Sequence, residues 1–235
     1  MATEKKRVSA STTRELLKAL REQTGWSNAD LISIMRGGGT SAKGSDYERE
    51  LCVRLSLWWT RDKRDDIFWR SAASGARAKV RGRQGRDTAG QHGDIAATDA
   101  IGAPLTDLLT IEIKRGYSEY TIQDCLDRSD DNAQQEWETW FEQTMESYED
   151  AGSFAWLMIT RRDRRQAMAW FPKFLLKELL AVGAFPKVPV PVISMRVVLR
   201  DMVKQGQPHQ IVGMHFEDFL AGTAQDHFIQ LSKRV

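Results

Sequence analysis

An acidic and a basic side chain lie two positions apart in the segment 109–115, where Glu112 and Lys114 alternate with β-branched and apolar residues. This alternation, closed by Gly116, predicts a strand that projects both charged side chains from one face. Burying such a pair is costly unless something compensates the charges, and a metal ion together with a phosphate would do so. Solvated edge strands also carry such pairs, so further ligands are needed to mark a site.

A second carboxylate comes from Asp94, at the start of a candidate strand over 94–99. The residues Gly102-Ala103-Pro104 indicate a turn before the segment 107–115. We therefore predict an antiparallel hairpin of these two strands, in which Asp94 approaches Glu112. The alternative is that Asp94 is an ordinary turn residue at the start of a strand.

A third carboxylate comes from Glu48, which follows Ser45 at the spacing of a capping box. The box predicts a helix from Ser45 to about Trp59, and Glu48 falls near the centre of its apolar stripe. Glu48 therefore either caps the helix or points inward at a metal or a basic group, and the two roles are compatible.

Three carboxylates and one lysine, namely Glu48, Asp94, Glu112 and Lys114, can build a Mg²⁺ site that leaves positions open to water and phosphate. In phosphodiester hydrolysis such a metal polarises a phosphoryl oxygen and activates water, while the lysine stabilises the developing charge. The sequence has no P-loop, no dinucleotide fingerprint and no Gly-x-Ser-x-Gly elbow. Neither cysteine nor His92 has the spacing of a zinc site.

Charge is unevenly distributed along the chain, although the net charge is only +2. The loop 72–92 is Gly-rich, and the six basic residues over 70–86 are accompanied by no acid. An extended basic segment of this kind suits contact with DNA phosphates, and a solvated surface loop is the alternative. The basic residues concerned are Arg70, Arg77, Lys79, Arg81, Arg83 and Arg86. The segment 129–152 carries eight acids and no base, and we expect it to face away from DNA.

The chain divides by pattern into two parts, 1–42 and 43–235. The first is predicted to be a polar arm, a small helical hairpin that begins at Thr13, and a flexible Gly-rich linker; a helix-turn-helix is the less favoured interpretation. The second is predicted to be an α/β domain with a core over 43–171 and an extension over 172–235. Its remaining expected strands are 66–71, 154–160, 166–171, part of 189–199 and 210–214. Its remaining expected helices are 132–150, 172–182 and 216–221, followed by a polar tail.

The 235 residues allow a stable core without staples, and two cysteines do not make a disulfide framework. No apolar run reaches the roughly 18 residues of a membrane span, and residues 1–10 lack the core of a signal peptide. We expect a soluble cytoplasmic protein with reduced cysteines and no membrane partner.

The order of these motifs resembles the PD-(D/E)xK nuclease superfamily, with Gly93-Asp94 followed eighteen positions later by Glu112-Ile113-Lys114. Within it, Lys43-Gly44-x-x-x-Glu48-Arg49-Glu50-Leu51 and Arg70-Ser71 are similar to archaeal Holliday junction resolvases. The resemblance covers roughly residues 43–115. Gly93 replaces the signature proline, the basic loop is longer than in small resolvases, and long segments flank the core.

The resemblance implies a restriction-endonuclease-like fold, a central mixed β-sheet flanked by helices, which here carries a small N-terminal helical appendage. It implies a metal held by Asp94 and Glu112, with Lys114 as the catalytic lysine and Glu48 as the helix carboxylate. It also implies that Arg49 and Arg70, with Ser71 in the same motif, serve activity or DNA contact, and that the protein is a symmetric homodimer.

The residues and the resemblance together predict a Mg²⁺-dependent DNA endonuclease, with Mn²⁺ able to substitute. A structure-selective, resolvase-like enzyme of recombination and repair, acting on branched DNA, is the leading interpretation. The alternatives are a restriction- or repair-type nuclease on duplex or flapped DNA, or a non-catalytic DNA-binding protein of the same fold.

Overall fold

The computed structural model describes residues 40–71, 93–116, 120–127, 135–185, 192–197 and 208–235. The chain forms two compact units, Met1–Ser45 and Asp46–Val235. The first unit contributes only residues 40–45 to the described part, so the predicted helical hairpin lies outside the described residues. Every described strand belongs to the second unit.

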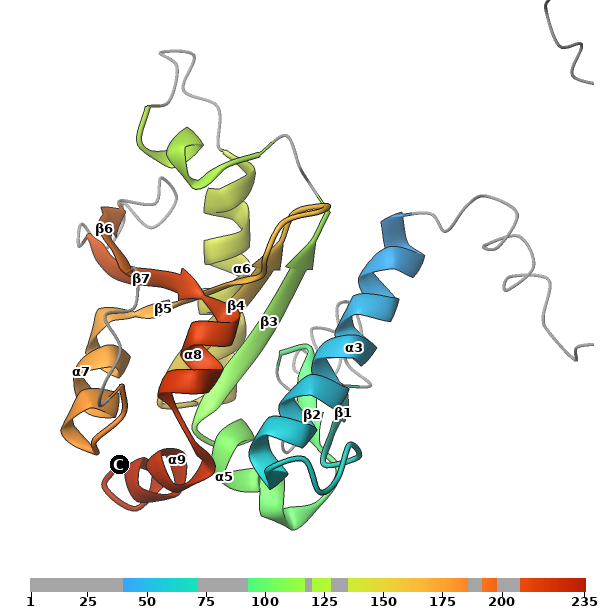
Figure 1. Cartoon of the computed structure of the whole chain (residues 1–235). Coiled ribbons are helices and arrows are strands. Elements are labelled where there is room, and N and C mark those ends of the chain that lie inside the picture. Colours follow the sequence, from blue (N-terminus) through green and yellow to red (C-terminus); the bar gives the residue numbers. More distant parts are fainter. Residues whose placement is uncertain (1–39, 72–92, 117–119, 128–134, 186–191, 198–207) are drawn as a thin grey trace, which may run out of the picture. The chain divides into compact units, whose positions relative to one another are not determined.

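A mixed five-stranded sheet confirms the predicted fold class (Figure 1). Its strands run in the order β3-β4-β5-β7-β6, with β3 parallel to β4 and the other neighbours antiparallel. The strand bounds are β3 Leu109–Arg115, β4 Ala155–Arg161, β5 Met168–Pro172, β6 Val192–Val197 and β7 His209–His215. Because β6 and β7 come from the predicted C-terminal extension, that segment builds part of the sheet.

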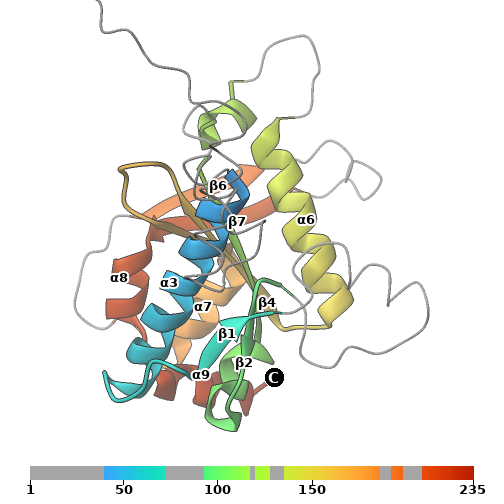
Figure 2. The same cartoon turned by 90° about the vertical axis from the view of Figure 1, so that its right-hand side faces the viewer.

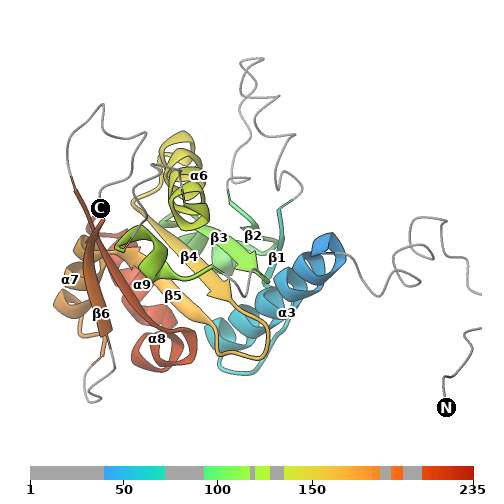
Figure 3. The ribbon, with the colours of Figure 1, turned by 90° about the horizontal axis from the view of Figure 1, so that it is seen from above.

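Helices cover both faces of this sheet (Figures 2 and 3). On one face α6, Glu136–Ala151, buries Trp137, Phe141 and Met145 against Trp156 and Met158. The predicted helix over 132–150 therefore forms, and its aromatic residues are part of the core. The opposite face packs against α3, Thr40–Thr60, with α5, Ala103–Thr106, α7, Lys173–Ala181, α8, Phe216–Gly222, and α9, Gln225–Ser232.

A separate two-stranded sheet lies at the edge of the main sheet. Here β1, Phe68–Arg70, pairs antiparallel with β2, Ile95–Ala97. The predicted hairpin of 94–99 with 107–115 is therefore wrong, because β2 pairs with β1 while β3 pairs in parallel with β4. The residues between β2 and β3 instead form the short helices η1, Ala100–Gly102, and α5.

Two further predictions need correction. Ser45 is not a helix cap, because α3 already includes Thr40 and the last residues of the predicted linker. The predicted polar tail contains α9, whose Phe228 and Leu231 are fully buried. A short amphipathic helix contains few apolar residues, so the pattern of the sequence did not predict α9.

Both cysteines, Cys52 and Cys125, are free, as expected, and both are buried. Within the described residues, none of the helices combines the length and apolar character needed to cross a bilayer.

Candidate active site

Strand β3 supplies the centre of the candidate site. Glu112 and Lys114 project from the same face, as predicted, and pack towards α6. Glu112 is only 8% exposed, and the Nζ atom of Lys114 lies 3.7 Å from its Oε2 atom. Lys114 donates a hydrogen bond to Oε1 of Gln143 on α6, at 3.0 Å. The ammonium is thus held at a fixed place beside the carboxylate.

Asp94 is fixed to the free edge of β3 by backbone geometry. Its N–H donates to the carbonyl of Ile111 at 2.7 Å, and its Oδ2 atom accepts from the N–H of Ile113 at 2.8 Å. These two bonds flank Glu112 along the strand. The predicted proximity of Asp94 to Glu112 is therefore confirmed, although it arises without the predicted hairpin.

Ser71 holds the backbone of Gly93 and Asp94 through two further hydrogen bonds. Its N–H donates to the carbonyl of Asp94 at 2.9 Å, and its hydroxyl donates to the carbonyl of Gly93 at 2.6 Å. Ser71 is buried, so its observed contacts position the site backbone. Its predicted contact with DNA remains a prediction.

The backbone at Gly93 explains why this chain departs from the signature proline. Gly93 has a φ of +74°, and a Cβ atom there would lie 2.6 Å from the carbonyl oxygen of Ile111. Proline is locked near a φ of about −65°, so it cannot adopt this conformation. Glycine permits the close approach that seats Asp94 on β3.

The electrostatics of the site leave negative charge uncompensated. Burial raises the pKa of Asp94 to about 7, and the neighbouring Glu112 acts in the same direction. The N–H of Ile113 and the Lys114 ammonium act in the opposite direction, but they do not offset the burial. A cation added beside Asp94 and Glu112 would favour the ionised form of Asp94.

Glu48 lies near this pair but is neutralised differently. Its Oε2 atom accepts a hydrogen bond from Nε of Arg70, and both side chains are largely shielded, with exposures of 15% and 26%. Glu48 also contributes to raising the pKa of Asp94, which places it close to that residue. Of the two roles predicted for Glu48, the structure shows the inward one, and the basic group that it meets is Arg70.

The donor set of this site fits a hard divalent cation. Among the described residues, no group of three or more His, Cys, Asp and Glu side chains is arranged to hold a metal. Mg²⁺, however, is usually bound through one or two carboxylates with water and substrate phosphate in the other positions. Asp94 and Glu112 satisfy that requirement, whereas a third ligand from Glu48 remains a prediction.

The other predicted DNA-binding residues fall into two groups. Arg49 is on the surface of α3 and pairs with Asp46 at 2.9 Å. The loop residues Arg77, Lys79, Arg81, Arg83 and Arg86 lie outside the described residues.

A cluster that sequence reasoning missed lies at the ends of the parallel strands. The guanidinium groups of Arg115 and Arg161 lie 5.3 and 5.2 Å from the ring centre of buried Tyr47. The two arginines are register partners on β3 and β4. Each ends a predicted strand or follows it directly, but the sequence does not show that the strands are parallel neighbours.

This geometry defines a class of protein. A mixed sheet whose edge strand carries Glu-x-Lys, with an Asp docked on that edge, is the PD-(D/E)xK nuclease arrangement. Residues 39–230 match the family described as "Phage putative PDDEXK endonuclease", and the chain belongs to that family. The match extends well beyond the resemblance over 43–115 and includes β6 and β7. No curated protein and no solved structure matches the chain significantly.

Proposed function

We propose that this protein is a Mg²⁺-dependent DNA endonuclease that hydrolyses phosphodiester bonds and also accepts Mn²⁺. The observation that carries the proposal is the buried pair Asp94 and Glu112, with Lys114 beside it on the same face of β3. A protein that only bound DNA would have no use for this costly arrangement. Membership in a PDDEXK endonuclease family supports the same conclusion.

Each residue has a distinct task in this proposal. Asp94 and Glu112 would hold the ion, which polarises the phosphate and lowers the pKa of water when bound. Lys114, anchored by Gln143, directs its ammonium at the charge that develops on the phosphoryl oxygens. Glu48 holds Arg70 close to Asp94, so that a guanidinium is available near the phosphate.

The finer part of the proposal concerns the substrate. The order of Gly44, Glu48, Arg70, Asp94 and Lys114 resembles the archaeal Holliday junction resolvases, which supports action on branched DNA by a homodimer. The basic loop 72–92 would bind the DNA backbone without reading sequence. The unit 1–42 would be an appendage to the nuclease domain.

The test is a cleavage assay on labelled four-way junction, flap, linear duplex and single-stranded DNA, with Mg²⁺, Mn²⁺ or EDTA. We expect cutting with either metal, none in EDTA, and the fastest cutting on branched DNA. Binding without cutting in any divalent metal would reject the enzyme. A preference for linear duplex would reject the resolvase-like label and leave a restriction- or repair-type nuclease.

The dimer has its own test. Light scattering after gel filtration should give twice the chain mass of 26.7 kDa. A single chain mass at assay concentration, with full activity, would show that one subunit is sufficient.

A further inference from the structure

A cavity of about 560 Å³ lies at the turn between β4 and β5. Arg162, Arg164 and Arg165 from this turn line it, together with His215 at the end of β7. Among the described residues that line it, none is acidic. None of these three guanidinium groups forms an ion pair with another described residue. Their positive charges are therefore available to an anion in the cavity.

One of the side chains that line this cavity carries a buried donor without an acceptor in the described part of the chain. Trp137 is 4% exposed and lines the cavity, and its Nε1–H has no acceptor among the described residues. By contrast, the indole of Trp170 donates to the hydroxyl of Thr160 at 2.9 Å, and that of Trp140 donates to Glu136 at 2.9 Å. A buried donor without an acceptor is uncommon, and it points to a ligand that supplies one.

The rest of the wall is apolar or neutral. Met168 and Ile193 line it, and so do the amides of Gln123 and Gln166. A cavity of this volume is the size of a small-molecule site and exceeds what a lone phosphate requires. Exposed arginines, an apolar wall and a buried donor among the lining side chains together suit a nucleotide, whose phosphate would meet the arginines and whose base would meet the apolar wall.

The cavity is next to the candidate active site. Thr160, which lines it, is the register partner of Lys114 on the neighbouring parallel strand. Register partners project from the same face at the strand spacing of about 4.8 Å. When a phosphate of a DNA strand lies at Lys114, an adjacent nucleotide of the same strand can therefore reach the cavity.

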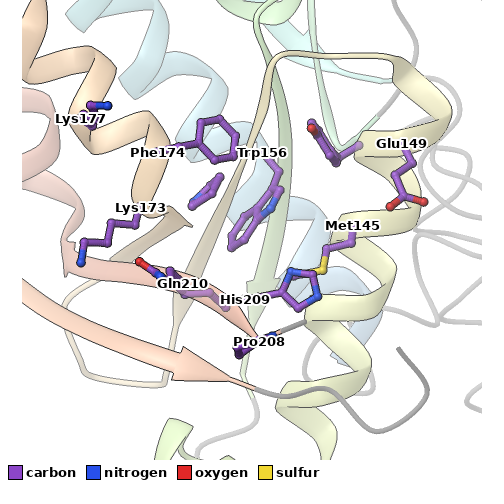
Figure 4. A pocket seen from close by; sticks show the side chains of 12 residues that line it. Met145, Glu149, Trp156, Lys173, Phe174, Lys177, Pro208, His209 and Gln210 are labelled. Atoms are coloured by element: carbon purple, nitrogen blue, oxygen red, sulfur yellow. The ribbon is translucent and has the colours of Figure 1, made fainter. Parts of the chain in front are cut away.

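A larger cavity of about 650 Å³ is less suited to a nucleotide (Figure 4). It is lined by Trp156, at the opposite end of β4 from Thr160, and by Glu149, whose charge would repel phosphate. Its lysines, Lys173 and Lys177, lie on α7, as the figure shows.

We propose that the cavity at the β4–β5 turn binds one unpaired nucleotide of the DNA strand being cut. The three arginines bind its phosphates, and Trp137 Nε1–H donates to an acceptor on the base. A base within a duplex cannot enter such a cavity without leaving its stack, so the site favours DNA with unpaired nucleotides beside the cut. This inference rests on the proposed nuclease function and names the form of its substrate.

The experiment measures binding without cleavage, by fluorescence anisotropy in EDTA, with a labelled single-stranded oligonucleotide and a fully paired duplex of equal length. The full chain is compared with Trp137→Phe and with the double variant Arg164→Ala/Arg165→Ala. The control is Lys233→Ala/Arg234→Ala, which removes two exposed positive charges at the C-terminal end of the chain. Melting curves establish that each variant is folded.

We expect the arginine variant to lose about 10-fold or more in affinity for the single strand, and Trp137→Phe to lose about 3–10-fold. Duplex affinity should change less than about 2-fold, as should both affinities of the control. Equal losses on both DNAs, or no loss, would overturn the proposal. This experiment measures binding and not cutting, so it tests the cavity separately from the nuclease function. If the protein showed the predicted binding pattern but cleaved no DNA, the proposal for the cavity would stand and the proposed nuclease function would be rejected.

Discussion

Glu48 and Glu112 are both shielded carboxylates near Asp94, and their charges are balanced in different ways. Glu48 accepts a direct hydrogen bond from Arg70. Glu112 has Lys114 only at 3.7 Å, and that ammonium donates to Gln143 instead. The protein therefore neutralises one carboxylate itself, whereas under the proposed function the pair Glu112 and Asp94 would be neutralised by a bound cation. This difference distinguishes a carboxylate that is already paired within the protein from two carboxylates that lack, among the described residues, a direct hydrogen bond from a basic side chain.

Removing the ammonium beside Glu112 should have the largest effect. Lys114→Ala is expected to lower the cleavage rate by roughly 10²–10³-fold, because a preorganised charge at the phosphate is lost. DNA affinity in EDTA should change little. The assay is single-turnover cleavage of the best substrate with Mg²⁺. A variant that retains more than about a tenth of the rate would remove Lys114 from the chemistry.

Breaking the neutralised pair should instead appear as lost stability. Glu48→Ala removes a carboxylate to which the largely shielded Arg70 donates, at a cost of about 1–3 kcal/mol in the free energy of unfolding. The matched control is Asp46→Ala, which breaks the exposed pair with Arg49 and should have little effect. Chemical denaturation measures both. Equal costs for the two variants would contradict the assignment of Glu48 to a shielded ion pair.

The pair Asp94 and Glu112 should make stability depend on pH. The sign of this dependence is opposite to that for a carboxylate in an ordinary ion pair, whose pKa is lowered. The pKa of Asp94 is raised to about 7 in the folded state, so folding binds a proton that the unfolded chain releases near pH 4. The wild-type protein without metal should lose stability as the pH rises from about 4 to about 7. Asp94→Asn lacks this loss.

The measurement is the free energy of unfolding of both proteins, by chemical denaturation in EDTA at pH 5 and pH 8. We expect Asp94→Asn to gain about 2–3 kcal/mol relative to wild type between the two pH values, since pH 5 lies roughly two pH units below the raised pKa of Asp94. A constant difference, or a gain at the lower pH, would contradict the raised pKa.

The anchor of Lys114 should have the smallest effect. Gln143→Leu removes one neutral hydrogen-bond acceptor and should reduce the cleavage rate about 2–10-fold, with little change in KM. Gln230→Leu, on the exposed surface of α9, is the matched control and should cleave at the wild-type rate. A Gln143→Leu rate equal to that of the control would show that Lys114 needs no anchor.

Much of the site was predictable because its signals are local. Alternation along 109–115 predicts β3 and places Glu112 and Lys114 on one face, and both observations hold. The helical period around Glu48 predicts its inward direction. These inferences depend on side-chain spacing within one element, which backbone geometry fixes.

The partners of these side chains depend on contacts between elements far apart in sequence, and here the prediction was less complete. Asp94 reaches Glu112 from a segment that leads into β2, which is paired with β1, because Gly93 allows a close approach that no spacing rule reveals. Likewise Gln143 and Arg70 become partners of Lys114 and Glu48 only through packing. The integration of β6 and β7 into the sheet is a further non-local feature.

The most direct test of the central claim is a titration of Mn²⁺ at pH 8, followed by the electron paramagnetic resonance signal of the free ion. Wild-type protein and the exposed-site control Asp46→Ala should remove free Mn²⁺ from solution, whereas Asp94→Asn and Glu112→Gln should remove at least about 10-fold less at the same concentrations. If Asp94→Asn and Glu112→Gln both bound Mn²⁺ as tightly as wild type, Asp94 and Glu112 would not form a metal site.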